Sequence, residues 1–237
     1  MPIQFDRRQF FGTAGAGLAL ATLPAAAQAQ TPSPAGVPAR PYEAKKLPFE
    51  PSQIKGMSEK ILVSHYENNY VGAVKRLNAI ATELATLDWA TAPNFHVNGL
   101  KREELIATNS MILHEHFFEA IGGDGHPTGA LAEAIKRDFG SIDRWRAEFS
   151  AMGKAEGGGS GWVILTYSPR DKRLVNSWAA DHTTTLAGGR PVLVLDMYEH
   201  AYHIDYGAKA AAYVDAFMSG IKWDEPGKLY QRYADEA

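Results

Sequence analysis

The chain has 237 residues, of which 45% are hydrophobic and 22% charged, with 22 glycines, 13 prolines and no cysteine. This length and composition allow a globular fold with a substantial core, and they exclude intrinsic disorder, a collagen-like chain and a disulfide-built scaffold. The formal net charge of -3, with 8 histidines, argues against a broad basic surface for nucleic acid or anionic lipid.

Residues 1–29 have the layout of an export signal. Arg7-Arg8 precede two phenylalanines, an apolar run rich in Gly and Ala follows, and Ala27-Gln28-Ala29 matches an A-x-A cleavage site. Paired arginines of this kind resemble the twin-arginine signals. The ordered three-part layout favours a signal peptide over a stray amphipathic tail. We therefore expect export to the periplasm by a route that carries folded proteins, which suits a cofactor inserted before export.

The remaining chain divides into three segments by composition and pattern. Residues 30–45, rich in Pro, Ala and Thr, are expected to form a linker. An α-hairpin domain is expected over 46–125 and an α/β C-terminal domain over 126–237. No stretch after the signal is apolar and long enough to span a membrane, so the mature protein is expected not to enter one.

Two long helices are predicted first. Apolar residues at three- and four-residue spacing run from Ser58, a plausible N-cap, to about Leu87. After a loop around residues 93–99, a second helical pattern extends from about Lys101 to Ile121, where Gly122-Gly123 end it.

The second half of the chain mixes helices and strands. Its predicted helices are Gly129–Phe139, Ile142–Met152 and Ala208–Ser219, and its predicted strands are Trp162–Tyr167, Leu174–Trp178 and Val192–Leu195. The strands follow one another through turns, which favours an antiparallel sheet. The predicted class is α+β: a long α-hairpin, then a small domain with a three-stranded antiparallel sheet and flanking helices.

The common catalytic motifs do not occur in the sequence. Gly157–Gly161 leads into a predicted strand, whereas phosphate-binding loops require a helix N-terminus. Neither a G-x-S-x-G elbow nor an H-E-x-x-H helix is present. The candidates for chemistry are therefore histidines and carboxylates.

The two predicted long helices each carry a histidine near the apolar face. Taken alone, His65 or His114 is more often a simple core or surface residue. Both, however, can meet across the hairpin, and a shared metal would offset the cost of burying them. His116 lies two residues further, about 200° around the helix, and is expected to face elsewhere; it is the spare candidate should His114 fail.

A third piece follows the last predicted strand. Asp196 ends that strand and His200 follows four residues later, which is good geometry for two ligands of one ion. A helix N-terminal aspartate beside an unrelated histidine is the alternative. Three imidazoles and one carboxylate together suit iron or manganese, and also zinc.

Five short motifs follow one another between about Leu47 and the C-terminus, and they include the candidate ligands. They are His65-Tyr66 with Leu77-Asn78, then His114-Glu115-His116-Phe117-Phe118, then Phe139-Gly140-Ser141, then Gly159-Ser160-Gly161-Trp162, and finally Asp196-x-x-Glu199-His200-Ala201-Tyr202 with Ile204-Asp205-Tyr206. In type and order they resemble the iron/manganese superoxide dismutase family.

This resemblance implies an activity and a ligand set. Superoxide is disproportionated to oxygen and hydrogen peroxide at one iron or manganese ion per subunit, which alternates between its two- and three-valent states. The implied ligands are His65, His114, Asp196 and His200, with a solvent molecule as the fifth. The His-Glu-x-aromatic-Phe run leans towards the iron-using members.

The resemblance also assigns supporting roles. Glu199 pairs with the ligand histidine of the other subunit, which implies a homodimer. Trp162 keeps the site dry together with Tyr198, which stands where the family usually has tryptophan.

The sequence departs from the family around the substrate gateway. A His and a Tyr, four and eight residues after the first ligand, are replaced by Asn69 and Ala73. We therefore expect a proton-delivery chain rebuilt from Tyr70 and His203. The glutamine that faces the metal-bound solvent is also missing, since its two matching positions are Ser110 and Gly158. The usual clue to the metal is thereby lost.

Two other functions compete with dismutation. A metal-binding protein of the same fold, acting in storage, sensing or carriage, fits the ligand set and the altered gateway. A non-haem iron oxygenase is disfavoured by the fourth ligand. The loop histidines His96, His126 and His182 are interpreted as surface residues.

Overall fold

The computed structural model describes residues 40–157 and 159–237, which belong to one unit, Ala35–Ala237. The predicted signal peptide and most of the predicted linker lie outside the described residues, and the domain boundary at residue 125 stays a prediction.

The helices are α1 (Glu59–Ser64), a π-helical segment (His65–Tyr70), α2 (Val71–Thr86), α3 (Asn94–Glu119), α4 (Gly129–Phe139), α5 (Ile142–Glu156), α6 (His203–Tyr206), α7 (Ala210–Ser219) and α8 (Asp224–Asp235), and the strands are β1 (Trp162–Ser168), β2 (Arg173–Ala179) and β3 (Arg190–Asp196). The predicted α+β class is confirmed. None of the helices in the described part of the chain is long and apolar enough to cross a membrane.

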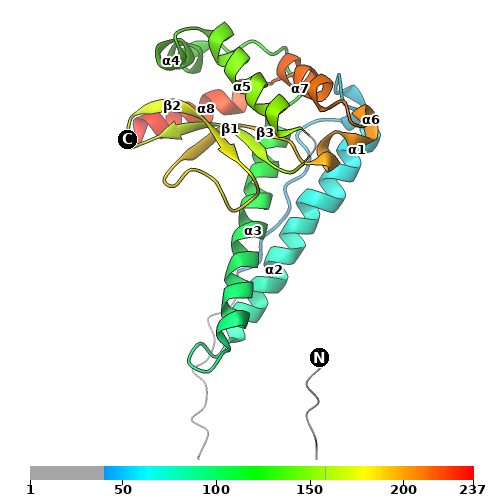
Figure 1. The fold of residues 1–237 in the computed structure, drawn as a ribbon, viewed down its shortest axis with the longest axis vertical. Coiled ribbons are helices and arrows are strands. Elements are labelled where there is room, and N and C mark those ends of the chain that lie inside the picture. The colour runs from blue at the N-terminus through cyan, green and yellow to red at the C-terminus, as the bar shows by residue number, and fades with distance from the viewer. Residues whose placement is uncertain (1–39, 158) are drawn as a thin grey trace, which may run out of the picture. The chain divides into compact units, whose positions relative to one another are not determined.

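The hairpin forms as its apolar spacing predicts. Segments α1, the π-helical turn and α2 follow without a break, and α2 runs alongside α3 (Figure 1). The Ser58 side chain caps the first helix by accepting a hydrogen bond from the Ile61 amide at 3.2 Å. Leu62, Leu77 and Phe117, which belong to the apolar spacing of the two predicted long helices, are buried. The π-helical turn itself has no counterpart in the prediction.

The predicted helices differ from the observed ones chiefly at α3, α5 and α8. Helix α3 begins at Asn94, directly after Pro93, because proline suits a helix start even where exposed residues such as Phe95 give no periodic signal. Helix α5 continues to Glu156. Helix α8 was missed, although Pro226 stands in its first turn.

The sheet has the order β2-β1-β3, with both pairs antiparallel. The central strand β1 is buried along its whole length. Its register places Trp162 opposite Asp196, at the end of the sheet that faces α3. Helix α5 packs against β1, and Gly153 allows the close approach, because an added Cβ there would lie 2.8 Å from Leu195 Cδ2.

A long-range hydrogen-bond pair joins the beginning and the end of the fold. The two carboxylate oxygens of Asp205 accept hydrogen bonds from the Ser58 backbone amide and hydroxyl, each at 2.6 Å. Asp205 follows His200 by five residues, and Ser58 caps the helix that leads to His65. The pair therefore fixes two segments that carry predicted ligands.

Candidate metal centre

The structure brings the four predicted ligands together. His65 comes from the π-helical segment, His114 from α3, Asp196 from the end of β3 and His200 from the turn that follows. One ligand atom from each lies within 4.8 Å of all the others. His116 is not in the group, in agreement with its expected position on another face.

The carboxylate of Asp196 is the centre of the cluster. Its Oδ2 lies 3.0 Å from His65 Nε2, 3.1 Å from His200 Nε2 and 3.5 Å from His114 Nε2. The Nε2 atoms of His114 and His200 are 3.5 Å apart. Asp196, His114 and His65 are buried, whereas the His200 side chain is partly exposed.

Backbone groups hold two of these side chains in place. His114 Nδ1 lies 2.6 Å from the Ser110 carbonyl oxygen, so it donates its hydrogen there and leaves a lone pair on Nε2. The other Asp196 oxygen, Oδ1, accepts a hydrogen bond from the Tyr198 amide at 2.9 Å. The Tyr213 hydroxyl donates to the Asp196 carbonyl at 2.9 Å, which fixes the strand end.

The electrostatics favour a negative charge on Asp196 and neutral rings at His65 and His114. Burial lowers the pKa of His65, and burial together with the nearby His65 lowers the pKa of His114 to about 3. Burial works against the ionisation of Asp196, but His200 and His65 outweigh it and hold the pKa of that carboxyl well below its usual range. The site is therefore an anionic carboxylate facing imidazole nitrogens.

This donor set fits a metal ion. The Nε2 lone pair of His114 points at an anionic oxygen and at a second imidazole nitrogen, which is unfavourable unless a cation lies between them. Three imidazoles and one carboxylate suit iron or manganese, and would also accept zinc.

The π-helical segment begins at His65 itself. An i→i+5 turn is rare and is found frequently at functional sites, where it redirects a side chain. Apolar spacing could not predict it, because a single wide turn hardly changes which residues face the core.

Aromatic rings enclose the cluster. The His65 ring lies 5.0 Å from each of Phe117 and Phe118, and the His114 ring meets Trp162 edge-on at 5.2 Å. The ring of Tyr198 stacks on His200 at 5.3 Å. The expected position of Trp162 and Tyr198 beside the ligands is thus observed.

One opening reaches the cluster from outside. It has a volume of about 340 Å³, and two ligands, His114 and His200, form part of its wall. The remaining wall residues are Asn68, Asn69, Gly72, Ala73, Arg76, Ile106, Ala107, Ser110 and His182. Asn69, Ala73 and Ser110, at which the sequence departs from the pattern that it resembles, therefore line the path to the ligands, whereas Gly158 lies outside the described residues.

His182 is predicted from the sequence to be a surface residue. This prediction is wrong, because the side chain is partly buried beside the ligands. Its Nδ1 lies 2.7 Å from the Tyr198 hydroxyl and accepts a weaker hydrogen bond from Trp162 Nε1 at 3.4 Å. Its ring centre is 6.3 Å from that of His114. Burial, above all, lowers the pKa of His182. Its loop position between β2 and β3 gave no periodic signal, so only the folded chain shows its place.

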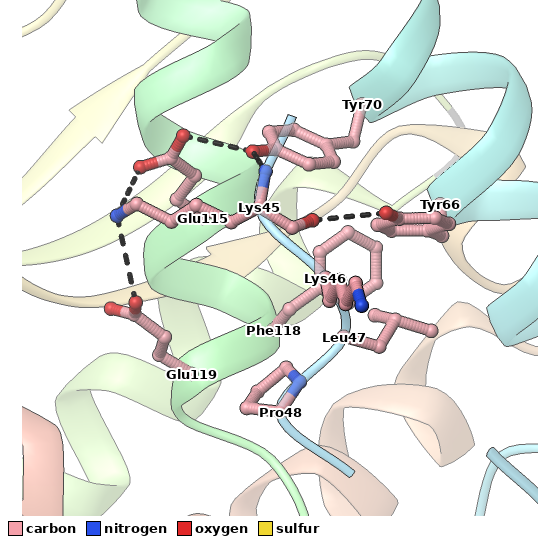
Figure 2. A pocket seen from close by; sticks show the side chains of 9 residues that line it. All are labelled: Lys45, Lys46, Leu47, Pro48, Tyr66, Tyr70, Glu115, Phe118 and Glu119. Atoms are coloured by element: carbon pink, nitrogen blue, oxygen red, sulfur yellow. Dashed lines mark hydrogen bonds and ion pairs between the residues drawn. The ribbon is translucent and has the colours of Figure 1, made fainter. Parts of the chain in front are cut away.

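The expected pairing of Tyr70 with His203 is wrong. The Tyr70 hydroxyl accepts a hydrogen bond from the Lys45 amide at 2.7 Å and donates one to Glu115 Oε1 at 2.9 Å. Figure 2 shows this network around a small cavity of about 40 Å³, to which Phe118 also contributes. His203 is exposed on α6, and Tyr70 lines this small cavity and is not among the described residues that line the opening.

Comparison with known proteins identifies close relatives. Residues 127–228 match the family model for iron/manganese superoxide dismutases, C-terminal domain. The superoxide dismutase [Fe] of Cupriavidus metallidurans is 71% identical over 182 residues, which cover 77% of this chain and 92% of that protein.

More distant relatives include both metal types. The superoxide dismutase [Mn] 1 of Halobacterium salinarum is 34% identical over 199 residues, covering 82% of this chain and 97% of the relative. The superoxide dismutase [Fe] of Aquifex pyrophilus is 34% identical over 192 residues, covering 78% and 89%.

Proposed function

The chain belongs to the iron/manganese superoxide dismutase family and disproportionates superoxide to oxygen and hydrogen peroxide; we propose that it does so at one ion held by His65, His114, Asp196 and His200. The observation that carries this assignment is the convergence of four ligand atoms within 4.8 Å, at the end of an opening that superoxide can enter. The cofactor is iron or manganese, and the 71% identity to an iron enzyme supports a lean to iron.

The chain's own residues set the conditions for this chemistry. When bound, the ion supplies the alternation between its two- and three-valent states, by which one superoxide is oxidised and the next reduced. Asp196 contributes the one negative charge, and the Ser110 carbonyl keeps His114 in the tautomer that can bind. The rings of Phe117, Phe118 and Trp162 exclude water from the side away from the opening.

Formation of hydrogen peroxide requires two protons. The Tyr198 hydroxyl and His182 lie on the side of the cluster where the opening meets His200, so they replace Tyr70 and His203 as the groups that hold a proton there. Burial raises the pKa of Tyr198 to about 12, so its hydroxyl stays protonated and available as a donor at neutral pH. Tyr198→Phe should lower the rate of the proton-dependent half-reaction and change its solvent isotope effect, whereas an unchanged isotope effect would remove Tyr198 from this role.

The decisive experiment is direct measurement of superoxide decay by stopped flow. The protein is loaded separately with iron and manganese, and His114→Ala, loaded in the same way, is the control. We expect one loaded form to approach about 10⁸–10⁹ M⁻¹s⁻¹ and the control to lose this activity. If neither form is faster than the control, the proposed site is wrong, and a metal-storing or metal-carrying role becomes the better interpretation.

We propose that the active protein is a homodimer. Glu199 is exposed in the single chain although it directly precedes His200, so a carboxylate is available to orient a ligand histidine across an interface. Light scattering on Glu199→Ala and the parent protein tests this. A parent that is monomeric at micromolar concentration contradicts the proposal.

We also propose export through the twin-arginine route. The support is the order of Arg7-Arg8, the apolar run and Ala27-Gln28-Ala29 in the sequence. Replacing Arg7 and Arg8 by lysine should leave the protein in the cytoplasm with residues 1–29 still attached. Periplasmic recovery of this variant in normal yield contradicts the proposal.

A further inference from the structure

The wall of the opening to the metal centre includes one charged side chain, that of Arg76. Arg76 stands on α2, seven residues after Asn69 and three after Ala73, so the three residues share one face of the helix. This is the face that forms the wall of the opening. Arg76 therefore stands two helical turns from Asn69 along the path that leads to His114 and His200.

Among the described residues that line the opening, Arg76 is the one with a permanent charge. The other members of the wall are two asparagines, a serine, three imidazoles and small or apolar residues. Besides the metal ion that the ligands would hold, the Arg76 guanidinium is therefore the fixed positive charge at this wall.

An ion pair with Glu103 orients this guanidinium without hiding it. Arg76 Nη2 contacts Glu103 Oε2, and Glu103 is not part of the wall. The Arg76 side chain remains 54% exposed. Because a guanidinium has five N–H donors, the remaining ones can meet a second anion.

The wall next to Arg76 leaves room for such an anion. A Cβ added at Gly72 would meet nothing within 4 Å, and the neighbouring Ala73 carries only a methyl group. A small anion can therefore pass between α2 and the imidazoles without displacing a side chain.

Taking the proposed function as given, we propose that Arg76 attracts superoxide into the opening and determines its preference for small monovalent anions. The chain has a net charge of -3, so on average it repels an anionic substrate. A local positive charge at the entrance attracts superoxide there, so that the repulsion by the whole chain is overcome at the opening. Glu103 works against Arg76, because its carboxylate screens part of the charge.

Four variants test this role. Arg76→Gln removes the charge, Arg76→Lys retains it, and Glu103→Gln removes the opposing carboxylate. Arg102→Gln is the matched control, since Arg102 also faces Glu103, at 3.9 Å, but does not line the opening. Superoxide decay is measured between about 10 and 200 mM ionic strength, where screening changes most. Azide, a small monovalent anion, is titrated separately against the metal-loaded proteins by absorption, which requires no turnover.

We expect Arg76→Gln to lower the second-order rate constant at low salt by about three- to ten-fold, to flatten its salt dependence and to weaken azide binding by a similar factor. Arg76→Lys should retain most of the rate, Glu103→Gln should raise it, and Arg102→Gln should match the parent. Equal rates, salt slopes and azide affinities in Arg76→Gln and the parent would overturn the inference, as would an equal loss in Arg102→Gln. Glu103→Gln tests the same charge independently if Arg76→Gln folds poorly. If the parent itself shows no catalysis, the proposed function fails, and the azide titration still decides the role of Arg76.

Discussion

Asp205 holds Ser58 through both of its carboxylate oxygens, across 147 residues of sequence. One oxygen accepts from the backbone amide and the other from the hydroxyl, while that hydroxyl itself accepts from Ile61 and caps α1. The pair thus joins the segment that follows His200 to the start of the helix that leads to His65. It gives the Ile-Asp-Tyr motif a structural explanation that does not involve the metal directly.

Asp205→Asn should destabilise the protein by about 1–2 kcal/mol, because it weakens two charge-assisted hydrogen bonds and loosens a helix cap. Urea unfolding of the metal-loaded protein measures this. Asp215→Asn is the control: Asp215 forms an exposed ion pair with Lys154, and we expect a change of about 0.5 kcal/mol or less. Equal effects of the two substitutions would show that the Asp205–Ser58 pair contributes no more to the free energy of unfolding than an exposed ion pair does.

Gly153→Ala should destabilise by about 1–3 kcal/mol, because the new methyl group would lie 2.8 Å from Leu195 Cδ2 and 3.1 Å from Val214 Cγ2. Gly99→Ala makes the same chemical change within α3, where an added Cβ meets nothing within 4 Å. The control should therefore gain about 0.5–1 kcal/mol from helix propensity. Thermal unfolding of both variants should give shifts of opposite sign, and shifts of the same sign would contradict the close packing of α5 on the sheet.

Tyr70→Phe should lower stability by about 1–2 kcal/mol, since it removes the acceptor of the Lys45 amide and the donor to Glu115. Dismutation should change little, because the Tyr70 hydroxyl does not reach the opening. Tyr66→Phe is a milder control, as it loses one hydrogen bond, to the Lys45 carbonyl. A large loss of kcat in Tyr70→Phe with normal stability would restore the catalytic role that the sequence predicted.

Glu156 predicts a pH dependence of stability. Its side chain is buried, neither carboxylate oxygen has a hydrogen-bond partner among the described residues, and burial raises its pKa to about 8. The folded state therefore prefers the protonated form. The stability linked to this group is complete below pH 4.5, the ordinary pKa, and is lost as pH rises through about 8.

Glu156→Gln should accordingly unfold at a higher temperature than the parent at pH 8.5 and show little advantage at pH 5. Scanning calorimetry at the two pH values measures the difference. If Glu156→Gln changes the unfolding temperature equally at both pH values, the ionisation of Glu156 is not a cause of the pH dependence of stability.

Much of the fold and the ligand cluster follows from sequence, for reasons that particular residues make clear. The stripe that contains Leu62 and Leu77 repeats every three or four residues, so it identifies a helix without knowledge of its partner. His114 occurs within such a stripe, and Asp196 ends an apolar strand. Local pattern alone therefore places both in the interior, where a metal can join them.

The features that the sequence did not reveal depend on segments distant along the chain. His182 comes to His114 and Tyr198 only because the β2–β3 connection folds back over α3, and its neighbours Asp181 and Thr183 are those of an ordinary surface loop. The Tyr70 hydroxyl is held by the Lys45 amide and by Glu115, which lie 25 and 45 residues away along the chain. Arg76 gives no signal in the sequence, because an exposed arginine on a helix is an ordinary surface feature and only the folded chain shows the opening beside it.

The pairing of Trp162 with Asp196 makes metal content a measure of correct strand alignment. Side chains alternate between the two faces of a sheet, so a slip of one residue would present Leu195 or Met197 to the histidines in place of the carboxylate. Such a molecule would retain its helices and much of its apolar burial, yet offer no anionic ligand. The metal content of a preparation therefore measures the fraction of molecules in which β1 and β3 are paired in the native register. Circular dichroism of the helices does not make this distinction.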